Sequence, residues 1–275
     1  MPPLPCTEDN ICLYVAYMAR SFAYSSIGNY VSALVYLQKI HRQEPITASN
    51  FMVHRTLQGA KRLLGDATVQ ATPLEPQHLL RMYFKLDMSK SYDLVWWLAI
   101  ILAFRGMLRK AHVTNTDQGI CVSDLSFKDW GVLLSLPKTK TIQYGERLLE
   151  IPFAKVLSSV FCVDYYLHLH LRRSKLKGSD FLFQFKSNHK WFPMTYKRFS
   201  KTLSEMTSKL KITGKISTHS LRRGGATWLH SIGYDLVEIK TRGDWKSLAV
   251  LLYLQDGISR KVQKDKVAAA FLRFV

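Results

Sequence analysis

Hydrophobic residues recur at helical spacing in three segments near the start of the chain. Thr7 precedes the first segment, which runs through ICLYVAYMAR, and Ser26 precedes the second, which runs through IGNYVSALVYL. The third extends from about Thr47 through FMVHRTLQGAKRLL and ends at Gly65. Spacings of three and four residues place apolar side chains on one face of a helix, and Ser, Thr and Gly are typical of helix ends. The pattern predicts a small helical domain over residues 1–66, with Thr7 and Ser26 as helix caps.

Small and polar residues then interrupt the helical pattern. GDATVQATPLEP contains two prolines and few large apolar residues, which predicts a linker over residues 67–76. Helical spacing returns near 75–86 and again over 92–112, where Leu94–Phe104 forms an apolar run of 11 residues. A membrane-spanning helix needs about 20. We therefore expect a buried core helix and no membrane association.

The hydrophobic period changes to two residues after Gly119. The runs ICVSDLSF, GVLLSLP and RLLEIPF predict three short antiparallel strands with loops at Lys128–Gly131 and Pro137–Glu146. Helical spacing then resumes in five further segments, at about 154–172, 195–210, 218–232, 246–258 and 262–273. The fold predicted is mainly α with a small three-stranded antiparallel sheet, and the larger domain covers residues 77–275.

The charge of the chain is unevenly distributed. Its 275 residues carry a formal net charge of +19, with a pI near 9.8, and 47% of them are hydrophobic. Residues 1–72 contain 6 Lys and Arg against 4 Asp and Glu, whereas residues 73–275 contain 33 against 16. The hydrophobic content excludes a disordered chain. A basic folded surface favours nucleic acid as the partner, with a generic basic protein as the alternative.

Other classes of site are disfavoured by residue spacing. The four cysteines are far apart, with no CxxC pair, which argues against a zinc finger and fits a reducing compartment. His168 and His170 lie beside no further set of ligands, so we predict no metal site. The opening MPPLPCTEDN lacks a basic segment, so no secretory signal is expected.

The segment THSLRRGGAT concentrates the candidate chemistry. His219 and Arg222 are three residues apart, so on a helix they share a face and together can bind a phosphate. Gly224 and Gly225 would each weaken a helix by about 1 kcal/mol, which predicts close backbone packing around them. The alternative is the solvated start of a basic helix.

Further candidates stand alone in other segments. Trp245 and Tyr253 are eight residues apart, close to two helical turns of about 3.6 residues each, although a tyrosine among Leu and Val is by default a core residue. Arg109 ends the apolar helix, where a cation also suits the helix dipole, and Arg105 competes with it for any role. Lys140 is expected at a hairpin tip, where a solvated turn is the alternative.

Taken in order, these residues resemble the tyrosine recombinase (phage integrase) family. That family carries an Arg after a buried helix, a Lys on a β-hairpin, H-x-x-R, a His or Trp, and a nucleophilic Tyr. The resemblance therefore implies a six-residue catalytic set: Arg109, Lys140, His219, Arg222, Trp245 and Tyr253. The wording THSLRRGGAT and GDWKS is most similar to the recombinases of eukaryotic DIRS-like retrotransposons. SSIGNYVSALVYLQKIH resembles the family's core-binding domain, which makes residues 1–66 a DNA-binding domain and 77–275 the catalytic domain.

The resemblance also implies a reaction. A site-specific recombinase or integrase would cleave and rejoin DNA through a 3′-phosphotyrosyl link at Tyr253. Arg109, Arg222 and His219 would stabilise the charge on the phosphate oxygens. Lys140 would be the general acid for the leaving 5′-oxygen, and the Trp245 indole can donate a hydrogen bond. No ATP, metal or other cofactor is expected.

Double-stranded DNA is the partner that the resemblance implies, bound by a homo-oligomer that forms a tetramer in its synaptic complex. The predicted phosphate contacts are basic residues outside the catalytic set: Lys138, Arg172, Arg173, Lys175, Lys177, Lys197, Arg198, Lys201 and Arg223. For each of them a solvated charge is the alternative. The protein is expected in the nucleus of a eukaryotic host, and otherwise in the cytoplasm or nucleoid.

Two positions depart from the family pattern. Many members carry an acidic residue three positions after the first Arg, where this chain has His112, and Asp244 stands beside Trp245. We expect Asp244 to face away from the site or to pair with Arg242. Two rival interpretations remain open: a catalytically silent DNA-binding protein derived from a mobile-element recombinase, and a type IB topoisomerase-like or resolving enzyme with the same tyrosine chemistry.

Overall fold

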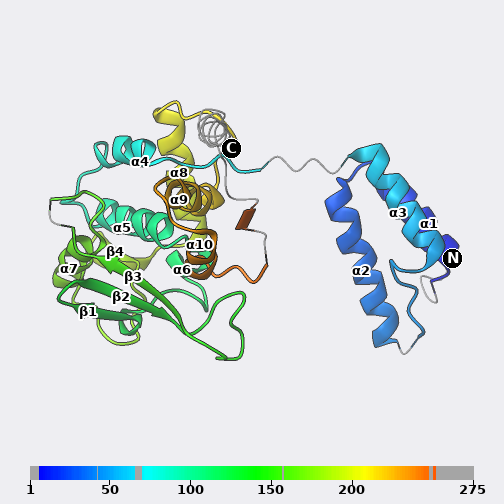
Figure 1. Ribbon diagram of the computed structural model, residues 1–275, viewed down its shortest axis with the longest axis horizontal. Helices are drawn as coiled ribbons and strands as arrows, with labels where there is room; N and C mark the ends of the chain where they lie inside the picture. The colour runs from blue at the N-terminus through cyan, green and yellow to red at the C-terminus, as the bar shows by residue number, and fades with distance from the viewer. Residues whose placement is uncertain (1–5, 42, 66–69, 157, 248–249, 252–275) are drawn as a thin grey trace, which may run out of the picture. The chain divides into compact units, whose positions relative to one another are not determined.

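The computed structural model describes residues 6–41, 43–65, 70–156, 158–247 and 250–251 of the chain. Two compact units divide it, residues 1–69 and 70–275. The first unit consists of three helices, drawn in blue in Figure 1: α1 (Glu8–Met18), α2 (Tyr24–Ile40) and α3 (Phe51–Leu64).

The ends of these helices test the predicted caps. The Thr7 hydroxyl accepts a hydrogen bond from the backbone N–H of Asn10 at 3.2 Å, so its predicted role is confirmed. Gly65, with φ of +70°, ends α3 as expected. The cap predicted at Ser26 is wrong, because α2 begins two residues earlier, after Ala23. The apolar faces of the three helices form one core: Ile11, Val15, Ile27, Val31, Val53 and Leu57.

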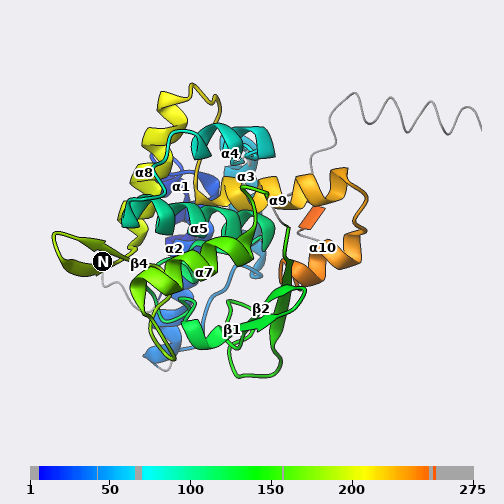
Figure 2. The same cartoon turned by 90° about the vertical axis from the view of Figure 1, so that its left-hand side faces the viewer.

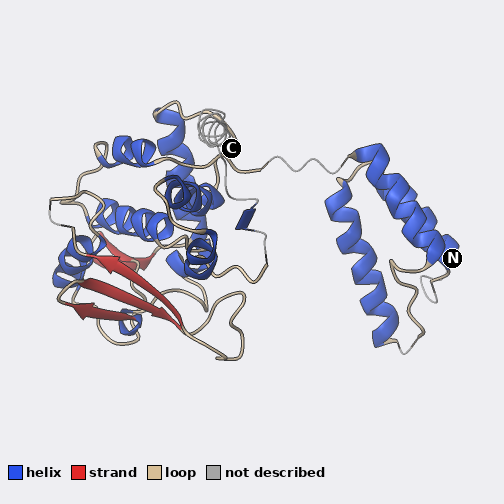
Figure 3. Ribbon diagram, viewed as in Figure 1, coloured by secondary structure: helices blue, strands red, loops and turns tan. Residues whose placement is uncertain are grey.

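The second unit contains the remaining elements. Its helices are α4 (Pro76–Tyr83), α5 (Ser91–Arg105), α6 (Lys110–Val113), the 3₁₀ turn η1 (Val122–Asp124), α7 (Val163–Ser174), α8 (Tyr196–Lys209), α9 (Thr218–Ser231) and α10 (Leu236–Arg242). Its strands are β1 (Leu125–Lys128), β2 (Gly131–Leu136), β3 (Leu149–Ala154), β4 (Gln184–Ser187) and β5 (Lys190–Pro193). The first three strands form an antiparallel sheet in the order β1-β2-β3, shown as arrows in Figure 3. The predicted fold class is confirmed.

Helix α5 is the centre of the second unit. Every residue from Leu94 to Phe104 is buried, as expected of its apolar run. The helix packs against α7, α9 and β4, and Figures 1 and 2 both show it between α4 and α7. Among the residues that the structure describes, no helix is long and apolar enough to span a membrane.

Three predicted boundaries are wrong. The helix expected over 92–112 is two helices, because α5 ends at Arg105 and the chain turns through Met107, which has a φ of +49°. This turn places Met107 in a second apolar cluster with Trp245. Helix α7 begins only at Val163, and residues 122–124 form η1 rather than part of a strand.

Three elements were not predicted: the strands β4 and β5 and the helix α10. The β4–β5 hairpin turns through Asn188 and His189, both with positive φ, and its sequence lacks the glycine that signals such a turn. Helix α10 is seven residues long and starts with a capping box between Asp235 and Glu238. The helix predicted at 262–273, and most of that predicted at 246–258, lie outside the described residues.

Candidate active site

Helix α9 carries two of the predicted residues. Ser217 caps it, so the helix begins at Thr218 with His219 exposed in its first turn. A methyl group on Gly224 would overlap the carbonyl oxygen of Leu74, and one on Gly225 would overlap that of Phe104. The predicted close packing at the two glycines is therefore confirmed. It brings α9 against the end of α5, so that Arg222 lies beside the turn that leads to Arg109.

Arg222 is buried and fixed from three sides. Its Nη1 donates to the carbonyl oxygen of Met107, and its Nη2 donates to that of Gly243 at 2.5 Å. Its guanidinium lies over the Trp245 ring, 3.9 Å from the centroid, in cation–π geometry. The turn after α5, the start of α9 and the loop after α10 thus converge on this one side chain.

Arg109 reaches the same loop from the other side. Its Nη1 donates to Asp244 Oδ2 at 2.9 Å, and its Nη2 donates to the backbone oxygen of Asp244 at 3.1 Å. Asp244 therefore faces the site and does not pair with Arg242, contrary to the expectation from sequence. The physical reason is the left-handed backbone of Asp244 (φ +56°), which closes the turn after α10 and directs its carboxylate toward Arg109.

The loop between β2 and β3 also binds Asp244. Oδ2 accepts hydrogen bonds from the hydroxyls of Thr139, at 2.7 Å, and Thr141, and Oδ1 accepts one from Arg147 Nη2. Lys140 lies between the two threonines and is exposed. Figure 3 shows this loop extending beyond the strands of the sheet. The predicted hairpin lysine is thereby held at the same point as the two arginines.

Burial and hydrogen bonding act in opposite directions on Asp244. Burial raises the pKa of a carboxyl group, but the hydrogen bonds from Thr141, Thr139, Arg109 and Arg147 stabilise the ionised form more, and they lower the pKa of Asp244 to about 2. The side chain is a carboxylate throughout the physiological range, and its donors come from two other segments of the chain, the α5–α6 turn and the β2–β3 loop.

Four nearby cations affect the pKa of His219. Its pKa is lowered, first by desolvation and then by the positive charges of Arg222, Lys110, Arg109 and Lys140. At neutral pH its ring is therefore neutral and can donate a hydrogen bond from one nitrogen. The same electrostatic environment identifies Lys110, whose Nζ lies 4.0 Å from the centre of the Tyr196 ring, as a fifth basic group beside the site.

Comparison with known proteins shows the family of the chain. The profile of the phage integrase family matches residues 98–254, more than half of the chain. The chain belongs to the phage integrase family. No curated protein matches it.

Several solved structures of integrases and recombinases share the fold. The Tn1549 transposon integrase in complex with circular intermediate DNA is 15% identical, with a TM-score of 0.60, over 96% of this chain and 86% of that one. The XerH site-specific recombinase bound to palindromic difH substrate is 14% identical, with a TM-score of 0.70, over 96% of this chain and 70% of that one. A lambda integrase dimer bound to a COC′ core site is 16% identical, with a TM-score of 0.64, over 92% of this chain and 82% of that one.

Two further arginines of this integrase-family chain lie nearby but make different contacts. Arg105 Nη1 donates to the carbonyl oxygen of Phe161 at 3.0 Å, and Arg242 donates to the carbonyl oxygens of Arg105 and Pro152. Desolvation lowers the pKa of both, that of Arg242 to about 10. Arg105, the alternative to Arg109 in the sequence analysis, thus links the end of α5 to the backbone at Phe161.

His112, which stands where many family members have an acid, is buried. Its Nδ1 lies 3.1 Å from the carbonyl oxygen of Gln118. Burial, helped by the charges of Arg109 and Arg222, lowers the pKa of His112 to about 4. The residue is a neutral core histidine that connects α6 to the loop that follows it.

The predicted phosphate contacts fall into two groups. Most are exposed: Lys138, Arg172, Arg173, Lys175, Lys177, Lys197, Arg198 and Lys201 lie at the surface or partly so. Lys138 pairs with Asp117 at 2.8 Å, and Lys201 with Glu205 at 3.8 Å. Arg223 is buried and donates to Gln70 Oε1. Most of the residues of α9 are buried, Arg223 among them, and its contact with DNA stays a prediction.

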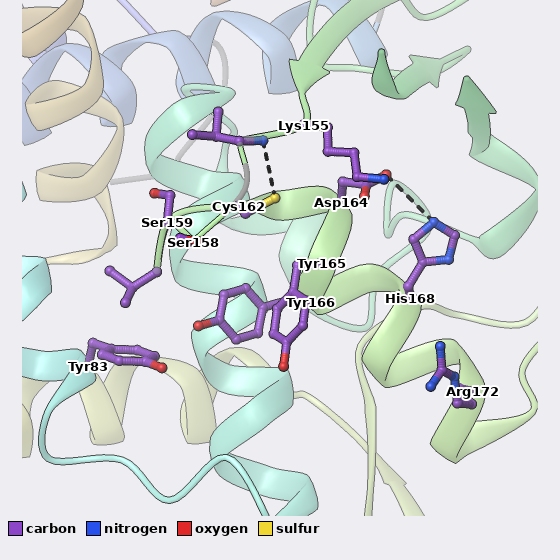
Figure 4. Close-up of a pocket in the computed structure, with 12 residues that line it drawn as sticks. Tyr83, Lys155, Ser158, Ser159, Cys162, Asp164, Tyr165, Tyr166, His168 and Arg172 are labelled. Atoms are coloured by element: carbon purple, nitrogen blue, oxygen red, sulfur yellow. Dashed lines mark hydrogen bonds and ion pairs between the residues drawn. The ribbon is translucent and has the colours of Figure 1, made fainter. Parts of the chain in front are cut away.

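Arg172 lines a cavity of about 530 Å³ beside α7. Figure 4 shows Tyr83, Tyr165 and Tyr166 on one side of this cavity and the ion pair of His168 with Asp164 on the other. None of the five described members of the catalytic set lines it. The cavity is therefore separate from the candidate active site.

Sequence reasoning found His219 and Arg222 by their spacing, and the resemblance to the family added Arg109, Lys140 and Trp245. Tyr253 itself lies outside the described residues. The residues missed are Lys110, Thr139, Thr141 and Arg147, and Asp244 was given the wrong partner. Only the repeated KTKT around Lys140 could have drawn attention to the threonines, because nothing local in the sequence marks a contact made about 100 residues away.

Proposed function

We propose that the protein is a site-specific DNA recombinase or integrase that cleaves and rejoins DNA through a 3′-phosphotyrosyl intermediate. The observation that carries this proposal is the convergence of Arg109, Arg222, His219 and Trp245, with the Lys140 loop, on one point of the second unit. These groups come from segments spread over more than 130 residues. Structural packing alone gives no reason to gather so many cations around one exposed histidine.

The arrangement suits a phosphodiester under attack. Arg109 uses two of its five N–H donors on Asp244, which leaves donors for a phosphate oxygen. The neutral His219 ring at the start of α9 donates a further hydrogen bond, and preorganised donors of this kind stabilise charge that develops in the transition state. Lys140 is the general acid that protonates the leaving 5′-oxygen.

Tyr253 is the nucleophile in this proposal. Val250, three residues before it, is buried in the apolar cluster that contains Trp245 and Met107, so the chain is anchored beside the site. Nearby cations favour the phenolate over the phenol, which makes a tyrosine a usable nucleophile near neutral pH. Attack breaks the bond from phosphorus to the 5′-oxygen, forms the phosphotyrosyl bond, and stores the energy needed for rejoining.

The remaining parts of the proposal concern the partner. Residues 1–66 are assigned as the core-binding domain, 67–76 as the linker and 77–275 as the catalytic domain, and both domains bind double-stranded DNA. The structures of similar fold include integrases solved with DNA, and one is a dimer. We assign the chain to a DIRS-like element on the wording of THSLRRGGAT and GDWKS, with a tetramer as its synaptic form and the nucleus as its place in a eukaryotic host.

A covalent-capture experiment tests the proposal. The full chain is incubated with a pool of nicked duplexes that carry a randomised segment, and protein–DNA adducts that survive denaturation are amplified over several rounds. The nick releases a short strand after cleavage, so the intermediate accumulates. We expect adducts with the wild type and with Tyr234→Phe, a control at an exposed tyrosine, and none with Tyr253→Phe.

The outcomes separate the rival functions. Retention of DNA without any adduct would favour the catalytically silent DNA-binding protein. Adducts that rejoin only to their original partner strand would favour the topoisomerase-like enzyme. Adducts that rejoin to a new strand support the recombinase.

A further inference from the structure

Asp244 connects parts of the second unit that no strand or helix joins. Its carboxylate accepts hydrogen bonds from Arg109 at the end of the α5–α6 turn, and from Thr139, Thr141 and Arg147 in the β2–β3 loop. Its side chain is 1% exposed, whereas that of Arg147 is 42% exposed. The four donors occupy the acceptor sites of one carboxylate, which is close to its full capacity.

Such a carboxylate is costly to keep unless each donor is in place. Burying an ion without partners is strongly unfavourable, so the loop and Arg109 stabilise Asp244 as much as it holds them. The backbone adds a second constraint, because Asp244 occupies the left-handed region at φ +56°, where few residues other than Gly, Asn and Asp are tolerated. A simple turn at this point would be served by glycine.

The position of Lys140 is the consequence that matters. The loop residues on both sides of it, Thr139 and Thr141, are bound to the same carboxylate, and the carbonyl oxygen of Lys140 accepts a hydrogen bond from Gln143 Nε2 at 3.1 Å. The lysine side chain itself stays exposed. Its backbone is therefore fixed while its ammonium group remains available.

We propose that Asp244 is a positioning residue that holds the β2–β3 loop, and with it Lys140, against Arg109. The inference rests on the proposed function in taking Lys140 as the general acid and Arg109 as a phosphate ligand. Asp244 itself touches no reacting atom. Its role is to keep two cations that come from different segments at a constant separation before DNA arrives.

Four variants separate this role from general stability. Asp244→Asn removes the charge but suits the left-handed backbone. Thr141→Val removes one of the three loop contacts of Asp244 and leaves its contact with Arg109. Lys140→Ala removes the proposed acid. Asp117→Asn is the matched control, because it removes the exposed ion pair with Lys138 in the same loop.

Limited proteolysis of the free protein gives the first readout. Trypsin cleaves after Lys138, Lys140 and Arg147 only when the loop opens, and the cuts are located by mass spectrometry. We expect Asp244→Asn and Thr141→Val to raise the cleavage rate in the loop about tenfold or more, since hydrogen bonds to a charged group are lost. Asp117→Asn should match the wild type. Equal rates in all variants would overturn the proposal whether or not the protein cleaves DNA.

Single-turnover cleavage gives the second readout, with the duplex enriched by covalent capture. Misplacement of a catalytic group by about 1 Å costs about 10²-fold in rate, so we expect that loss for Thr141→Val without a change in the Kd for DNA. A duplex with sulfur in place of the bridging 5′-oxygen needs no general acid, because a thiolate leaves without a proton. It should restore Lys140→Ala and Thr141→Val, and restore Asp244→Asn only in part, since that variant also disturbs Arg109.

The two readouts fail separately. Absence of adduct with the wild type contradicts the proposed function, and proteolysis then still decides whether Asp244 holds the loop. If the wild type forms adduct, the positioning role is overturned when Thr141→Val and Asp244→Asn both cleave DNA at the wild-type rate. A loss that sulfur does not restore in Thr141→Val also overturns it, because the defect would not pass through Lys140.

Discussion

Two pairs of arginines in the second unit have different surroundings. Arg105 and Arg242 both lie against the Phe153 ring, at 5.6 and 5.4 Å from its centroid, and donate to backbone carbonyls. Arg109 and Arg222 contact Asp244 and Trp245, and their charges lower the pKa of His219. Arg105 and Arg109 are one helical turn apart in number, yet only the second reaches the site.

The difference lies in the partners rather than in the arginines. Within the described residues, the first pair joins β3, α5 and α10 by donating to backbone carbonyl oxygens and to no carboxylate. Arg222 also donates to two carbonyl oxygens, those of Met107 and Gly243, but its guanidinium lies over the ring of Trp245, the neighbour of Asp244 in the chain. Arg109 pairs with a carboxylate that also holds the hairpin loop, and it keeps donors for an anion. The turn at Gly106–Leu108 separates the two roles, because it ends α5 between Arg105 and Arg109.

The largest effect should distinguish the two pairs in catalysis. Arg222→Gln removes a donor from the phosphate site and should slow single-turnover DNA cleavage about 10²–10³-fold. Arg105→Gln should lower the melting temperature but leave the cleavage rate of the folded protein unchanged. Equal losses of rate in both variants would mean that the comparison assigns the wrong arginine to the site.

The second-largest effect is a loss of folding stability in acid that arises from the buried His112. Its folded-state pKa of about 4 lies below the unfolded value of 6.5, so the unfolded chain binds the proton more tightly. Stability is complete above pH 6.5, falls as the pH drops from 6.5 to 4, and loses about 3 kcal/mol in total. Urea unfolding at a series of pH values measures this.

A variant isolates the contribution of His112. His112→Asn can keep the hydrogen bond to Gln118 and should reduce the loss between pH 6.5 and 4, whereas His189→Asn, at an exposed turn, should retain it in full. The loss that remains in His112→Asn comes from His170 and His219, whose pKa values desolvation also lowers. The depressed pKa of Asp244, about 2 against the usual 3.8, gives a further loss with the same sign only below pH 4. A wild-type stability that stays flat from pH 7 to 4 would contradict the burial of a neutral His112.

A change in the packing between α9 and α5 should have an intermediate effect on the free energy of unfolding. Gly225→Ala places a methyl group on the carbonyl oxygen of Phe104, and overpacking of this kind costs about 1–3 kcal/mol. Gly59→Ala in α3 encounters nothing within 4 Å and should stabilise its unit by up to about 1 kcal/mol. Thermal unfolding of both variants measures the difference. Opposite signs are expected, and a neutral Gly225→Ala would show that α9 does not press against α5.

Local signals in the sequence predicted most of the fold and the outline of the site. The Thr7 cap, the end of α3 at Gly65 and the burial of α5 follow from neighbouring residues, and so does the close packing at Gly224 and Gly225. Helix α10 was missed although Asp235 and Glu238 give a capping-box signal. The partners of Asp244 could not be predicted, because Thr139 and Thr141 meet it only through the folded arrangement of β2, β3 and α10.

The smallest effect concerns a cation outside both pairs. Lys201 and Glu205 form an exposed i,i+4 pair on α8, which contributes at most about 0.5 kcal/mol. Lys201→Gln should leave stability nearly unchanged but reduce the slope of log K for DNA against log salt by about one, if Lys201 contacts a phosphate. Filter binding at several salt concentrations measures the slope. An unchanged slope would make Lys201 a solvated charge.

In the proposed function, the arginines, His219 and the Lys140 loop surround the phosphate that Tyr253 attacks. The most direct measurement is to locate the bond in the captured protein–DNA adduct by trypsin and nuclease digestion followed by mass spectrometry. Residues 247–260 form one tryptic peptide, SLAVLLYLQDGISR, and Tyr253 is its one tyrosine. We expect a nucleotide phosphate on this peptide. A nucleotide on any other peptide would contradict the proposed function.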